Sequence, residues 1–152
     1  MNVVYVKIHS DLRKEGQIYQ VSDEVEQEVE IFADGKVCLH AISHEGLPCW
    51  EEEKEVEPDV ALEMLAKIAT YLENPRTFQV DHVGQWQLNA KYEDGSIKEV
   101  KGPMIGKVMA DNVDLTAYLR EKLPFMSLGI LIKPIVYKKG RLNDFEILIT
   151  RF

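Results

Sequence analysis

Apolar and polar residues alternate through the N-terminal part of the chain, which is the pattern of strands that bury one face. The run Val3–His9 is β-branched and aromatic and predicts a strand, and residues 17–21 predict a second, shorter strand. Two further apolar runs flank Asp34-Gly35, a dipeptide that favours a tight turn because glycine tolerates positive φ. The pattern therefore predicts a β-hairpin at this turn.

The register of this hairpin decides which side chains share a face, because a one-residue slip moves every side chain across the sheet. A two-residue turn at Asp34-Gly35 would put on one face Val29, Ile31, Cys38 and His40. A three-residue loop, Ala33 to Gly35, would instead separate an apolar face from a polar one. We favour this second register, in which the apolar face holds Val29, Ile31, Val37, Leu39 and Ala41, and the polar face holds Glu28, Glu30, Phe32, Cys38 and His40.

Apolar residues at helical spacing follow the acidic run 51–57 and predict a helix. Pro58 suits its first turn, acidic residues there complement the positive end of the helix dipole, and Asn74-Pro75 ends it. The acidic run is then the start of the helix and a solvated surface, and a cation site made of its carboxylates is the weaker alternative. The residues expected to face the core are Leu62, Leu65, Ile68, Ala69 and Leu72.

The second half of the chain continues with the same kinds of element. Residues 77–83 predict a strand, and 86–92 predict another, with Trp86, Leu88, Ala90 and Tyr92 on one face. Asp94-Gly95 turns the chain into a returning strand over 96–101. A shorter helix follows over 113–123, capped by Asp111 or Asp114, with its inward residues Leu115, Tyr118, Leu119 and Leu123.

Strand, hairpin and helix thus occur twice in the same order, at about 17–74 and 77–123. We interpret this as an internal β-β-β-α duplication, with two unrelated β-β-α stretches as the alternative. The terminal strands, 3–9 and 128–152, would complete the sheet, and the last strand, 145–152, is apolar on both faces and expected to be central. The predicted fold class is α+β: a single domain over 1–152, mainly antiparallel sheet with two helices.

Composition and charge narrow the classes of function. The chain has 152 residues, with 18 basic and 26 acidic side chains and a net charge of −8. We therefore expect binding to neither nucleic acid nor an anionic membrane, because both need a basic face. The only basic candidate is the segment 133–141, which we interpret as a solvated turn. There is no secretory signal, no run long enough to span a membrane and only two cysteines, so we expect a cytoplasmic protein with reduced thiols.

The candidate chemistry gathers in one short segment that contains both cysteines and two of the four histidines: Cys38, His40, His44 and Cys49. Four such donors are the right number for a tetrahedral zinc ion. The spacing, however, matches no zinc-knuckle pattern, and the loop would have to fold back to bring His44 and Cys49 to the face of Cys38 and His40. Zinc is therefore the alternative to our main expectation, which is no cofactor, with a buried Cys38 and surface histidines.

The sequence evidence for a catalytic motif is weaker than the evidence for a zinc site. A thiolate nucleophile would need activation by a neighbouring histidine, but the glutamates that follow Trp50 would raise the pKa of a nearby thiol. The run 102–108, GPMIGKV, lacks both the spacing and the hydroxyl residue of a phosphate-binding loop. An enzyme would require a concave pocket in which His40, His44 or His82 meets a carboxylate.

One segment resembles a group of small proteins of Gram-positive bacteria. The shared features are a Trp-x-Leu strand, a Tyr-x-Asp-Gly turn and a helix with an arginine near its end, here Trp86, Leu88, Tyr92, Asp94, Gly95 and Arg120. The resemblance covers about a third of the chain. That group has no known activity, so the resemblance implies no site residues.

We therefore expect a non-catalytic cytoplasmic binding or assembly module. Its exposed sheet faces and edges would mediate self-association or hold a protein partner. The alternative is a small hydrolase-like or metal-binding protein that uses Cys38, His40, His44 and Cys49.

Overall fold

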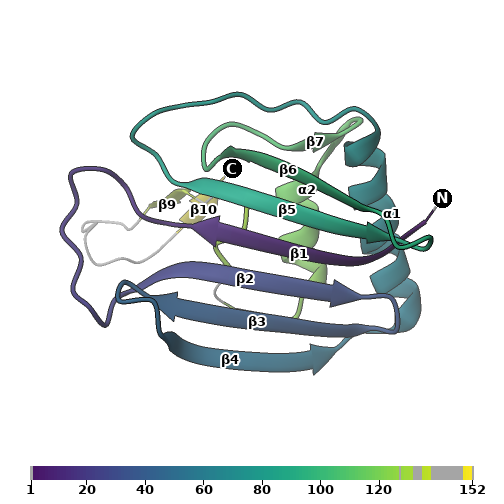
Figure 1. Cartoon of the computed structure of the whole chain (residues 1–152), viewed down its shortest axis with the longest axis horizontal. Helices are drawn as coiled ribbons and strands as arrows, with labels where there is room; N and C mark the ends of the chain where they lie inside the picture. Colours follow the sequence, from purple (N-terminus) through teal and green to yellow (C-terminus); the bar gives the residue numbers. More distant parts are fainter. Residues whose placement is uncertain (1, 127, 132–134, 138–148, 152) are drawn as a thin grey trace.

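A computed structural model describes residues 2–126, 128–131, 135–137 and 149–151. Six strands form one antiparallel sheet in the order β4-β3-β2-β1-β5-β6 (Figure 1). Their bounds are β1 Val3–Asp11, β2 Glu24–Phe32, β3 Lys36–Ser43, β4 Pro48–Glu55, β5 Gln85–Tyr92 and β6 Ile97–Pro103. The mainly antiparallel α+β fold expected from the sequence is confirmed.

Two helices, α1 (Pro58–Glu73) and α2 (Leu115–Lys122), lie behind this sheet in Figure 1 and cover one of its faces. Two short strand pairs complete the described structure: β7 (Met109–Ala110) with β8 (Val113–Asp114), and β9 (Ile135–Tyr137) with β10 (Ile149–Arg151). As predicted, α1 has Pro58 in its first turn, and α2 is capped by Asp114, whose carboxylate accepts a hydrogen bond from the backbone N–H of Ala117.

The hydrophobic core lies between the sheet and the helices. Alternate residues of each central strand point into it, among them Val6 and Ile8 of β1 and Leu88 of β5, all fully buried. The described segment 128–131 also packs on this face through two buried polar side chains. Gln27 Oε1 accepts a hydrogen bond from the Gly129 backbone N–H at 2.7 Å, and Ser10 Oγ accepts one from the Leu131 N–H at 3.0 Å. These bonds satisfy polar groups that would otherwise be costly to bury.

The hairpin register that we favoured is confirmed. Ile31 pairs with Val37, Val29 with Leu39, and Glu30 with Cys38. The five predicted apolar residues are all buried on the helix side: Val29, Ile31, Val37, Leu39 and Ala41. The polar set therefore lies on the opposite face of the sheet, which no described helix covers (Figure 1).

The acidic run 51–57 was assigned wrongly to the start of the helix, although most of its carboxylates are exposed, as expected of a solvated surface. Residues 51–55 belong to strand β4, which pairs with β3. A tight turn at Gly46, whose φ is +89°, returns the chain to the sheet. Glutamate has low β-propensity, but the alternation still holds, because Trp50 packs against the core while Glu51 faces away from it. Propensity alone favoured a helix here, and pairing with β3 overrides it.

Two other predicted strands are absent from the described structure: residues 17–21 and 77–83 form loops. The strands next to these segments in the chain are already paired on both sides, β1 with β2 and β5, and β5 with β1 and β6. Leu62 of α1, predicted to face the core, is 52% exposed. In the tail, β9 and β10 pair with each other in a separate sheet, and much of the region predicted as strand lies outside the described residues. The internal duplication stays a prediction.

Candidate functional site

The face of the sheet that points away from the helices carries most of the polar side chains of strands β1 to β4. We call this surface the open face. Strand β1 contributes Tyr5, Lys7 and His9, and β3 contributes Lys36, Cys38 and His40. The carboxylates are concentrated on β2 and β4: Glu26, Glu28, Glu30, Glu51, Glu53 and Glu55. The open face therefore becomes strongly acidic toward the β4 edge.

A chain of hydrogen bonds crosses the open face from β1 to β4. The Tyr5 hydroxyl donates to Glu30 Oε2 at 2.5 Å, and Glu30 Oε1 lies 3.2 Å from His40 Nε2. On its other side, His40 Nδ1 lies 3.0 Å from Glu51 Oε2. His40 thus bridges two carboxylates on neighbouring strands.

This arrangement favours the charged forms of His40 and Glu30. Burial alone would lower the pKa of His40, but the hydrogen bonds and charges of Glu51 and Glu30 outweigh it and raise this pKa. Burial alone would raise the pKa of Glu30, yet hydrogen bonds from Tyr5 and His40 lower it overall. Burial, followed by the hydrogen bond and charge of Glu30, strongly raises the pKa of Tyr5. At neutral pH the network is therefore a phenol, a carboxylate and an imidazole with an increased share of the charged form.

Cys38 lies beside this network and is buried. Burial, then the charges of Glu30 and Glu53, raises the pKa of its thiol. Cys49 is exposed, and desolvation with the charges of Glu24 and Glu45 raises its pKa as well. Both cysteines are thus held as neutral thiols, which are poor nucleophiles, as the acidic surroundings led us to expect.

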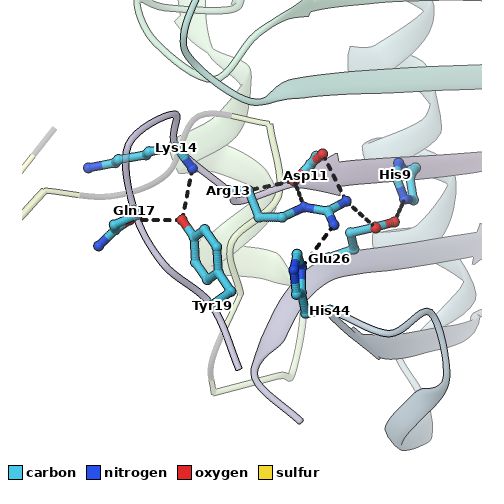
Figure 2. Close-up of polar contacts among 8 residues, drawn as sticks. All are labelled: His9, Asp11, Arg13, Lys14, Gln17, Tyr19, Glu26 and His44. Atoms are coloured by element: carbon cyan, nitrogen blue, oxygen red, sulfur yellow. Dashed lines mark hydrogen bonds and ion pairs between the residues drawn. The ribbon is translucent and has the colours of Figure 1, made fainter. Parts of the chain in front are cut away.

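A second polar cluster lies where β1 ends and β2 begins, and Figure 2 shows it. The Arg13 guanidinium makes two bonds to Asp11, at 2.9 and 3.1 Å, and one to Glu26 at 2.5 Å. Glu26 in turn lies 2.7 Å from His9 Nε2, and Arg13 Nη1 lies 3.3 Å from His44 Nδ1. Hydrogen bonding to Asp11 is the main reason that the pKa of Arg13 is raised. Arg13 is committed to internal partners, so this cluster fixes the ends of the strands.

Beyond Arg13, the loop between β1 and β2 borders an open cleft of about 460 Å³. Tyr19 organises the loop, because its hydroxyl accepts a bond from the Lys14 N–H and donates one to Gln17, both at 2.8 Å (Figure 2). His82, in the loop before β5, also lines this cleft and contacts Glu15. Of the three histidines considered for an enzyme, only His82 lines a described cleft next to a carboxylate.

The structure separates the four residues considered for zinc. Cys38 and His40 share the open face, but His40 is bound to Glu30 and Glu51, while His44 contacts Arg13 and stacks near Tyr19. Cys38 pairs with Glu53, four positions past Cys49 on β4, which puts the two cysteines about 13 Å apart along the strands. Within the described ranges, no group of three or more His, Cys, Asp or Glu side chains is arranged to hold a metal ion.

Two residues of the open-face network, Tyr5 and Glu51, lay outside the predicted set, and Glu30 was not predicted as a partner of His40. The hairpin register had placed Glu30 on the polar face with His40, and their diagonal proximity could have been predicted from it. Tyr5 and Glu51 depend on which strands flank the hairpin. Since β4 was not recognised as a strand, no sequence signal gave its position.

Comparisons of the chain with protein-family models, with curated proteins and with solved structures found no match. No helix in the described part of the chain is long and apolar enough to cross a membrane. The function therefore has to be argued from the surface itself.

Proposed function

We propose that this protein is a binding module that holds a cationic, extended segment of a partner protein against the edge of β4. The observation that carries the proposal is the combination, on one strand, of a free hydrogen-bonding edge and carboxylates without cationic partners. In the described structure β4 pairs with β3 only.

The charge on β4 is poorly compensated from within the described part of the chain. Glu51 is bound to His40, and Glu52, on the helix side, lies 3.6 Å from Lys54. Glu53 and Glu55 on the open face make no ion pair with any described residue, and Lys36, which is opposite Glu55 on β3, lies over the Phe32 ring. Lys54 is turned toward the helix side, where its ammonium donates to the Pro124 carbonyl at 3.1 Å. The strand's own cation therefore does not neutralise its open face.

An exposed edge strand is a template for pairing with another strand, and proteins limit such pairing by placing charge there. On β4 the charge is almost all of one sign. Two copies of this strand paired with each other would oppose glutamates to glutamates, which is destabilising. A strand rich in lysine or arginine would instead gain both main-chain hydrogen bonds and cross-strand ion pairs. The edge thus favours a cationic partner over self-association.

A peptide of alternating Lys and Val, with the same eight-residue length as β4, tests this proposal. Fluorescence anisotropy at physiological salt measures its affinity. We expect binding that weakens at higher salt and that falls by at least about tenfold in the double variant Glu53→Lys and Glu55→Lys. A matched double variant on the exposed surface of the helices, Glu73→Lys and Glu121→Lys, should bind the peptide like the natural protein.

A second peptide separates strand addition from simple charge attraction. Alternating Lys and Pro carries the same charge, but proline has no N–H to donate to a strand edge. The proposal predicts that this peptide binds at least about tenfold more weakly than the Lys-Val peptide. Equal affinity of the two peptides, or equal loss in the two double variants, would contradict it.

A further inference from the structure

The imidazole of His40 lies one strand behind the edge on which the proposed function rests. Its strand, β3, separates β2 from the edge strand β4 (Figure 1). Glu51 is directly opposite His40 on β4, and Glu51 Oε2 lies 3.0 Å from His40 Nδ1. The other ring nitrogen, Nε2, lies 3.2 Å from Glu30 Oε1 on β2. A charged His40 therefore competes with any cationic partner for the carboxylate of Glu51.

Glu51 is also one of the residues whose main chain faces the free edge. The Val56 N–H donates to the Gly35 carbonyl at 2.8 Å, so every second residue counted back from Val56 bonds to β3. The main-chain groups of Glu51, Glu53 and Glu55 then point away from β3. An added strand would bond to these three residues and place its own side chains beside their carboxylates. Glu51 would thus contact His40 on one side and the partner on the other.

Four carboxylates face His40 from the strands on either side of it: Glu28 and Glu30 on β2, and Glu51 and Glu53 on β4. The thiols near them stay neutral, because desolvation and nearby carboxylates raise the pKa of Cys38, on the same strand as His40, and of Cys49, on β4. Imidazole is the side chain that ordinarily changes its charge between about pH 5 and pH 8. Among these groups, His40 is therefore the one whose charge responds to pH near neutrality.

We propose that His40 regulates the binding of a cationic segment at the β4 edge according to pH. The protonated imidazole holds Glu51 and repels the partner's cation, and loss of the proton releases this carboxylate to the partner. The inference rests on the function proposed above and adds a direction to it, since the partner binds more tightly as the pH rises.

The contacts of His40 set the pH range of this effect. Burial alone would lower the pKa of His40, but the hydrogen bonds and charges of Glu51 and Glu30 raise it above its ordinary value of 6.5. The imidazole of the free protein is therefore mostly charged near pH 6. As the pH rises through the pKa of the folded protein, the charge is lost.

The size of the effect follows from the spacing of the strands. A partner's lysine opposite Glu51 would lie two strand spacings, about 10 Å, from the His40 ring. At that distance, two like charges at a protein surface change a binding constant by about threefold or more. Because linkage is reciprocal, bound peptide should lower the pKa of His40 by the matching amount, about half a pH unit.

The experiment measures the affinity of the alternating Lys-Val peptide, with both ends blocked, near pH 6 and near pH 8.5 at one ionic strength. We expect the natural protein to bind the peptide at least about threefold more tightly at the higher pH. His40→Gln should bind it equally at both pH values. His9→Gln is the matched control, because His9 pairs with Glu26 and not with β4, and this variant should keep the pH dependence.

An NMR titration of the His40 ring, with and without saturating peptide, tests the coupling itself. We expect the peptide to lower the pKa of His40, a change that a merely structural role of His40 would not produce. An affinity independent of pH, a pH dependence that persists in His40→Gln, or an unshifted pKa would overturn the regulation while the binding proposed for β4 stands. A protein that binds the peptide at neither pH would overturn both.

Discussion

His40 should make the stability of this protein depend on pH in a defined direction. The perturbation is His40→Gln, which keeps a hydrogen-bonding side chain but removes the titrating group between Glu30 and Glu51. In the folded protein the pKa of His40 lies above its ordinary value of 6.5. Its charge therefore contributes stability that is complete below about pH 6.5 and is lost as the pH rises through the folded-state pKa.

The lower limit of this effect comes from Glu30, whose pKa is below its ordinary value of 4.5. Its ionised form contributes stability above about pH 4.5 that is lost as the pH falls through the lowered pKa. The ion pair is thus strongest between these limits. The side chains of His40, Glu30 and Glu51 are 31%, 23% and 59% exposed, so solvent screens much of the attraction. We therefore expect only about 0.5–1 kcal/mol from the charged interaction.

Urea denaturation followed by tryptophan fluorescence measures this contribution. His40→Gln should lower the free energy of unfolding by about 0.5–1 kcal/mol near pH 5.5 and by clearly less near pH 8.5. His82→Gln, which changes an exposed pair with Glu15, is the matched control and should have little effect at either pH. An NMR titration of the His40 ring gives its pKa directly. A value at or below 6.5, or an equal loss of stability at both pH values, would refute the reasoning.

Three further outcomes are expected. Replacing Gln27 by Leu leaves a buried backbone N–H of the segment 128–131 without its acceptor and should cost about 1–3 kcal/mol in urea denaturation; an unchanged midpoint would mean that this segment does not pack as described. Gly102→Ala should cost about 1–3 kcal/mol, because a Cβ there would lie 2.4 Å from the Trp86 ring, and much less in a Trp86→Phe background, so an unchanged cost in that background would contradict the contact. Because Cys38 and Cys49 lie apart, elemental analysis should find less than about one zinc per ten purified chains, and one zinc per chain would show that the loop refolds around the ion.

The sequence predicted those elements in which local signals and tertiary pairing agree. The Asp34-Gly35 turn and the alternation beside it indicate a hairpin, and Pro58 with Asp59 indicates the first turn of α1; the structure has both. The helical spacing also predicted that Leu62 of α1 faces the core, but Leu62 lies at the margin of the apolar stripe and is exposed.

The errors in secondary structure arose where strand pairing overrides the local propensity of the residues. Residues 48–55 are rich in glutamate and precede a helix, so propensity favours extending that helix backward, but β3 offers a free edge and β4 forms on it. Residues 17–21 have the composition of a strand but form a loop, because β1, the strand that precedes them, is already paired on both sides. Strand order in a sheet depends on contacts between distant segments, and one sequence contains no direct record of them.

The same limit applied to the candidate site. The register placed Cys38, His40 and Glu30 on one polar face, which the structure confirms. The spacing of cysteines and histidines drew attention to zinc, while the partners of His40 turned out to be carboxylates, one of them, Glu51, on the unrecognised strand. The acidic β4 edge, on which the proposed function rests, could be seen only once that strand was in place.

Hydrogen–deuterium exchange of the β4 amides, with and without the alternating Lys-Val peptide, tests the proposed function most directly. If the peptide adds to the sheet as a strand, the β4 amides that point away from β3 become protected, while those of the opposite edge strand β6 stay unchanged. Saturating peptide that leaves the exchange of β4 unaltered, or that slows exchange equally at β4 and β6, would contradict the account.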